Sequence, residues 1–61
     1  MKVSEFIRVL KKNGVEFEKH GKEHDKYVNP KNGKSARLPR HASKEIKTGT
    51  MEQILKDLGL K

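Results

Sequence analysis

Turn-forming residues divide this chain into short segments and limit the elements that it can form. Asn13-Gly14, Gly21, the stretch 29–34 and Pro39 each interrupt the pattern of apolar residues. Glycine, proline and asparagine are the residues that turns favour, each for its own backbone reason. The segments between these positions have the length of short strands, and longer segments with helical spacing lie on either side. The expected order is therefore helix, strand, strand, strand, helix.

The first helix is predicted over residues 3–13. Ser4 can cap it by accepting a hydrogen bond from a free amide of the first turn, and Gly14 can adopt the conformation that ends it. Its apolar residues recur on one helical face: Val3, Phe6, Ile7 and Leu10.

The last helix is predicted to begin at Thr50. Thr50 and Gln53 have the spacing of a capping box, in which each side chain bonds the other residue's backbone amide. Gly59 ends the helix, and Leu60 can fold back on it. Its apolar stripe comprises Met51, Ile54, Leu55 and Leu58.

The strand segments are predicted over 15–19, 24–29 and 35–38. In the first, Val15 and Phe17 alternate with charged residues, which places both in the core. A connector, residues 40–47, follows the third strand and is anchored by one apolar residue. That residue is Ile46. The predicted core contains the two helical stripes together with Val15, Phe17, Tyr27 and Leu38.

The central strand has two alternative orientations, with Tyr27 or with Val28 facing the helices. We favour Tyr27, because it offers the larger apolar area in a chain that is 5% aromatic. Asp25 then shares its side, near a rim that water reaches, and His24 and Lys26 stand on the open face. The predicted fold class is α+β, one domain over residues 1–61, with a three-stranded antiparallel sheet and two helices on one face.

Charge is the strongest signal in the composition. Fifteen Lys and Arg against eight Asp and Glu give a net charge of +7 in 61 residues, a field that attracts nucleic acid or another polyanion. The absence of cysteine excludes disulfides and thiolate chemistry and fits the cytoplasm. No apolar run is long enough for a membrane helix, and a core this thin has no room for an organic cofactor.

Histidine offers the clearest catalytic option. His20 and His24 have the spacing of metal ligands on a helix, but Gly21 lies between them in a turn, so no metal site is expected. An imidazole among cations can instead cleave RNA, because it exchanges protons near neutral pH and RNA carries its own 2′-hydroxyl nucleophile. The products would be a 2′,3′-cyclic phosphate and a 5′-hydroxyl. An exposed strand histidine without catalytic function is the simpler alternative.

Several motifs in order resemble one family along essentially the full chain. They are Ser4-Glu5-Phe6, Asn13-Gly14-Val15, Gly21-x-x-His24 with Tyr27, Leu38-Pro39-Arg40-His41, Glu45-Ile46-Lys47-x-Gly49-Thr50 and Ile54-Leu55-Lys56-x-Leu58-Gly59. This set resembles the HicA family of small bacterial toxins, which are messenger-RNA interferases. Many members carry small residues or serines where this chain has Lys22 and Glu23.

The resemblance implies a fold like that of double-stranded-RNA-binding domains, ribonuclease activity centred on His24, and a HicB-type antitoxin that blocks the site. We therefore expect a cytoplasmic, metal-independent toxin endoribonuclease without cofactor or membrane contact. Lys22 and Lys26 are the expected phosphate contacts, with Arg40 a weaker one.

Three questions remain open at this level. The second acid/base group is unassigned, with Lys26, Tyr27 or a substrate-bound water as candidates. His41 is expected to pack in the connector or touch RNA and not to be catalytic. The rival functions are a non-catalytic RNA-binding module and a protein whose basic surface serves an acidic partner.

Overall fold

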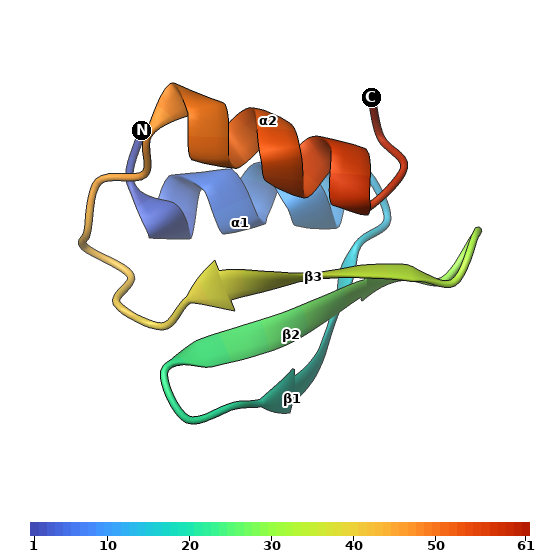
Figure 1. Ribbon diagram of the computed structural model, residues 1–61, viewed down its shortest axis with the longest axis horizontal. Helices are drawn as coiled ribbons and strands as arrows, with labels where there is room; N and C mark the ends of the chain where they lie inside the picture. Colours follow the sequence, from blue (N-terminus) through green and yellow to red (C-terminus); the bar gives the residue numbers. More distant parts are fainter.

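The computed structural model describes residues 1–61 and has the predicted order of elements. The sheet is antiparallel with strand order β1-β2-β3, and both helices lie on one side of it (Figure 1). The α+β class is thus confirmed. The elements are α1 (Val3–Lys12), β1 (Glu16–His20), β2 (His24–Asn29), β3 (Lys34–Pro39) and α2 (Thr48–Asp57).

Helix α1 begins before its predicted cap. Its N-cap is Lys2, and Ser4 lies inside the helix, so the predicted Ser4 cap is wrong. The free amides of the first turn find backbone partners instead. Val3 donates to the carbonyl of Lys44 over 2.9 Å, and Ser4 to that of Ala42 over 3.0 Å. The connector after β3 therefore satisfies the helix end that a side chain was expected to satisfy.

Helix α2 also begins earlier than predicted, at Thr48 with Lys47 as N-cap. Thr50 lies inside the helix, so the predicted capping box is wrong. Gln53 instead donates to Oδ1 of Asp57 over 2.9 Å, one turn further along the helix. The predicted C-terminal end is confirmed.

Strand β1 is the sheet's outer edge, and all five of its residues are exposed. Val15 is buried just before it, as predicted, but the Phe17 side chain is 42% exposed, so its place in the core is wrong. Phe17 packs edge-on against Tyr27, with ring centroids 5.6 Å apart. Helix α2 packs on β3, at the far side of the sheet. Phe17 faces the helix side of the sheet, but α2 does not reach β1 and leaves its ring exposed.

Strand β2 has the predicted bounds and the predicted orientation. Asp25, Tyr27 and Asn29 are buried, whereas His24 is exposed and Lys26 is half-buried. The amide of Asn29 donates to the carbonyl of Leu58 over 2.9 Å and joins β2 to the end of α2. The orientation with Val28 inside is thereby excluded.

The core lies between the sheet and the helices. Ile46 is buried, which confirms it as the anchor of the connector. No helix is long and apolar enough to cross a membrane. The buried apolar residues are Val3, Phe6, Leu10, Val15, Tyr27, Ala36, Leu38, Ile46, Ile54 and Leu58.

Candidate active site

A three-residue turn between β1 and β2 sets the position of His24. The amide of Gly21 donates to the carbonyl of His24 over 2.9 Å, which closes the turn. A Cβ atom on Gly21 would collide with that carbonyl oxygen, so no other residue fits without a shift of the backbone. The glycine of the Gly21-x-x-His24 motif therefore holds the histidine at the start of β2.

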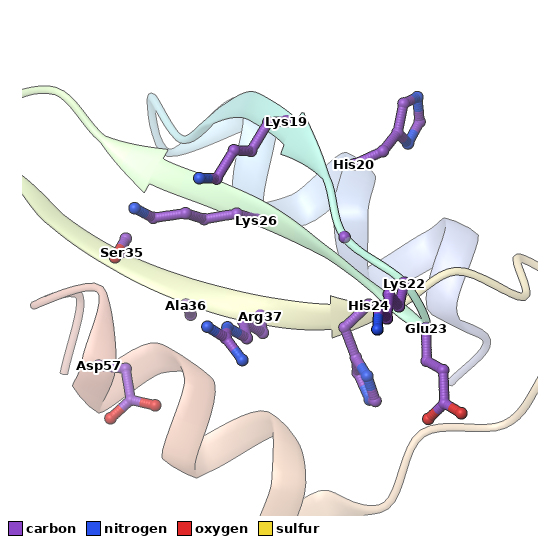
Figure 2. A pocket seen from close by; sticks show the side chains of 11 residues that line it. Lys19, His20, Lys22, Glu23, His24, Lys26, Ser35, Ala36, Arg37 and Asp57 are labelled. Carbon is purple, nitrogen blue, oxygen red and sulfur yellow. The ribbon is translucent and has the colours of Figure 1, made fainter.

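His24 is exposed on the open face of the sheet, opposite Pro39 of β3. Its ring projects away from the strand, whereas the ring of His20 points in the other direction (Figure 2). The Nδ1 atom of His20 lies 2.9 Å from Oδ1 of Asp25, on the helix side of the sheet. The two imidazoles therefore point in different directions, although both residues line the larger of the hollows described below.

Two surface hollows meet at His24. The larger one lies over the open face of the sheet and extends past the edge strand β3 to Asp57 of α2 (Figure 2). The smaller one lies between the turn and the connector. Lys22, Glu23 and His24 line both hollows. Lys22 forms no ion pair, so its charge is available to a ligand in either hollow.

Three cations form a row across the larger hollow, one from each strand. Lys19 is opposite Lys26 in the register of β1 and β2, and Lys26 is opposite Arg37 in the register of β2 and β3. Nζ of Lys26 lies 3.0 Å from Oε2 of Glu18. Like charges directly opposite one another destabilise a sheet, so this row is suited to an anionic ligand. Sequence reasoning found Lys26 and missed Lys19 and Arg37, because the row exists only once the register is known.

Arg40, predicted to contact RNA, is bound to the protein itself. Its Nε donates to Oδ1 of Asp25 over 3.3 Å, and its Nη2 donates to the carbonyl of Gly21. The guanidinium thus ties the connector to the turn that carries His24. It remains 44% exposed, which leaves part of its charge facing solvent.

Asp25 is the common partner of His20 and Arg40. Its side chain is 12% exposed. The hydrogen bond from His20 lowers the pKa of the Asp25 carboxyl, and the charges of His20 and Arg40 act in the same direction, against the raising effect of burial. The Asp25 carboxylate is therefore maintained, despite its place near the core, by two neighbours from β1 and the connector.

Tyr27 does not share the face of His24. It lies on the helix side, where burial and the nearby Asp25 charge raise the pKa of its phenol. Tyr27 is thus placed away from any substrate at His24, and of the candidates for the second acid/base group, Lys26 and water remain. Lys26 lies on the same face of the sheet as His24, but its ammonium forms an ion pair with Glu18.

The smaller hollow brings the connector to His24. His41 and Lys44 line it together with residues of the turn. Sequence reasoning left contact with RNA as one alternative for His41 and missed Lys44, because the two residues lie 17 and 20 positions after His24. The Leu38-Pro39-Arg40-His41 motif was the signal that could have pointed to them.

These features define a small basic α+β domain with an exposed histidine between two cation-lined hollows. The chain matches the family model for the HicA toxin of bacterial toxin-antitoxin over residues 3–60. It is 48% identical over 61 residues to the Probable mRNA interferase HicA of Pseudomonas fluorescens (strain Pf0-1), covering all of this chain and 98% of that protein. It is 49% identical to the Probable mRNA interferase HicA 2 of Photorhabdus laumondii subsp. laumondii, with both chains covered completely.

The chain therefore belongs to the HicA toxin family, as its ordered motifs predicted. The match covers residues 3–60, which include every residue of the site described above. No solved structure matches the chain closely.

Proposed function

We propose that this protein is a toxin that cleaves messenger RNA as a metal-independent endoribonuclease. The observation that carries the proposal is the exposed imidazole of His24 between two hollows lined by cations from the turn, the strands and the connector. Two full-length relatives are named mRNA interferases, which supports the same substrate. The net charge of +7 suits a polyanion.

In this proposal His24 acts as general base or general acid on the 2′-hydroxyl or on the leaving 5′ oxygen. Such a group contributes typically 10²–10⁴-fold to the rate. Lys22 and Lys26 contact phosphate oxygens and stabilise the negative charge that develops on the non-bridging oxygens in the transition state. Arg40 makes a weaker contact, because its guanidinium already donates to Asp25 and Gly21.

We further propose that the partner is an antitoxin of the HicB type and that both act in the cytoplasm. Membership of a toxin-antitoxin family supports the existence of a partner. An inhibitor of this site has to cover the cationic hollows around His24. An acidic surface on the antitoxin is the complement that this charge favours.

The test is cleavage of a labelled RNA by purified protein at low salt with a chelator present, beside His24→Ala. We expect His24→Ala to reduce cleavage by about 10²–10⁴-fold and to retain its circular dichroism and RNA affinity. The parent should leave 2′,3′-cyclic phosphate ends. Lys12→Gln, on the exposed side of α1, serves as the control and should cleave like the parent.

Two results would contradict the proposal. Equal cleavage by the parent and His24→Ala would clear His24 and indicate another residue or a contaminant. RNA binding without cleavage by either protein would favour a non-catalytic RNA-binding module on the same basic face.

A further inference from the structure

His41 and His24 line the same small hollow, although they lie 17 positions apart in the sequence. His41 is the second residue after β3, and it is exposed in the connector. Both imidazoles line the smaller hollow, whereas His20 is absent from it. The hollow therefore contains two groups that ordinarily exchange protons between pH 5 and 8.

Hydrogen bonds on the N-terminal side of His41 fix its approach to the turn. The preceding residue, Arg40, donates to Asp25 and to the carbonyl of Gly21. Gly21 in turn donates to the carbonyl of His24. One chain of contacts consequently links the backbone next to His41 with the backbone of His24.

Hydrogen bonds on the C-terminal side of His41 fix the connector to α1. The amide of Lys44 donates to the carbonyl of His41 over 3.1 Å and forms a tight turn. The carbonyls of Ala42 and Lys44 accept from the first amides of α1. His41 is thus held on a short segment that is anchored on both sides, which is the preorganisation that a catalytic group requires.

The charges around the hollow suit a phosphodiester. Three cations outnumber one carboxylate there, and the only ion pair that these cations form joins Arg40 to Asp25, which does not line the hollow. A phosphate bound among these cations would occupy the hollow that both histidines line. The titratable and charged groups that face the hollow are Lys22, Glu23, His24, Arg40, His41 and Lys44.

We infer that His41 is the second proton-transfer residue of RNA cleavage, an inference that rests on the proposed function. One imidazole takes the proton of the 2′-hydroxyl as the bond from the 2′ oxygen to phosphorus forms. The other, protonated, gives its proton to the 5′ oxygen as the bond from phosphorus to that oxygen breaks. The products are the 2′,3′-cyclic phosphate and the 5′-hydroxyl, and water returns both imidazoles to their starting states.

The test uses two RNA substrates with His41→Ala, His41→Gln, His24→Ala and the parent. One substrate is ordinary, and the other has sulfur in place of the 5′ oxygen at a single cleavage position. A sulfur leaving group departs as a thiolate, a far weaker base than an alkoxide, and needs no proton. We expect both His41 variants to cleave ordinary RNA about 10²–10⁴-fold more slowly than the parent.

The sulfur substrate separates a proton donor from a structural residue. On the sulfur substrate, the variant that lacks the general acid should lose less than about tenfold in cleavage rate. The variant that lacks the general base should keep its full loss. The His41 variants and His24→Ala should therefore differ in this respect. This pattern assigns the acid and the base. The inference would be overturned if the His41 variants and His24→Ala all lost the same cleavage rate on the sulfur substrate as on ordinary RNA.

The pH dependence provides an independent readout. With two transferring groups, the parent's kcat/KM should rise and then fall with pH, and His41→Ala should lose one of the two limbs. His20→Ala, which removes the histidine outside this hollow, should keep both limbs. Parent-like cleavage by folded His41→Ala would overturn the inference and leave the proposed function standing, whereas an inactive parent would overturn both.

Discussion

The guanidinium of Arg40 donates through Nε to Oδ1 of Asp25 over 3.3 Å and also reaches the carbonyl of Gly21. This contact joins the connector to the start of β2 and to the turn that carries His24. Arg40 therefore has a structural task besides any contact with RNA. The hydrogen bond from His20 lowers the pKa of the Asp25 carboxyl most, and the contact with Arg40 acts in the same direction.

Replacing Arg40 should affect the rate of cleavage more than the affinity for RNA. Arg40→Lys keeps the charge but loses the planar fork that holds two partners at once. A misplaced turn can reduce the rate by up to about 10²-fold, so we expect a lower kcat for cleavage with RNA affinity within about twofold of the parent. Single-turnover cleavage and anisotropy titrations measure the two effects. A variant weakened in binding alone would show that Arg40 acts only as a phosphate contact.

The lowered pKa of Asp25 predicts how stability changes in acid. A carboxyl whose pKa is lower in the folded state contributes stability above its ordinary value of 3.8, and this contribution disappears as pH falls through the lowered pKa. Asp25→Asn should therefore be less stable than the parent at pH 7, and the difference should narrow below about pH 4. Urea unfolding at several pH values measures it. The control is Asp57→Asn, which removes a carboxylate that has no cationic partner. A loss of unfolding free energy in Asp25→Asn that does not change with pH would contradict the prediction.

The row of Lys19, Lys26 and Arg37 predicts a change in the salt dependence of RNA binding. Each phosphate contact on a single strand contributes about 0.7 to the slope of log affinity against log salt. The double variant Lys19→Gln/Arg37→Gln should therefore lower the slope by about 1.4. Binding is measured with a 2′-O-methyl RNA, which lacks the nucleophile and cannot be cleaved.

The control for this row is Lys11→Gln/Lys12→Gln on α1, which removes the same charge from exposed positions outside both hollows. We expect its slope to stay within about 0.3 of the parent's, well under one phosphate contact. If both double variants lower the slope equally, net charge and not the row determines binding.

Leu38 and Phe17 should differ in their effect on stability. Leu38 is fully buried, so Leu38→Ala should cost about 2–5 kcal/mol of the free energy of unfolding. Phe17 is 42% exposed at the edge strand, and Phe17→Ala should cost about 1 kcal/mol or less, close to the loss of its edge-on contact with Tyr27. Denaturant unfolding of both variants makes the comparison. Equal losses would mean that Phe17 is more deeply packed than its exposure indicates.

Turn residues and apolar periodicity were sufficient to predict much of the fold. They defined the order of the elements, because each depends on residues a few positions apart. Tyr27 was correctly placed inside, since successive side chains of a strand alternate and its area exceeds that of Val28. The family motifs then identified the toxin class and selected His24 among three histidines.

Local pattern alone misjudged residues whose environment comes from distant parts of the chain. Phe17 alternates like a core residue, but the position of β1 at the edge leaves it exposed. Ser4 and Thr50 resemble caps, but the N-caps are Lys2, two residues before Ser4, and Lys47, three residues before Thr50. For α1 the connector supplies the carbonyls that accept from the first amides. Backbone partners brought by the tertiary fold outweighed the side-chain signals.

By itself, the sequence determined the five elements, the two faces of β2, the basic character of the protein and the importance of the Gly21 turn. Only the tertiary structure decided which cations form one row, which groups accept hydrogen bonds from Arg40, and that His41 and His24 line the same hollow. The physical reason is that the path of the connector depends on hydrogen bonds between residues far apart in the sequence, such as Arg40 with Asp25 and Val3 with Lys44. Such long-range contacts leave no mark in the local spacing of residues.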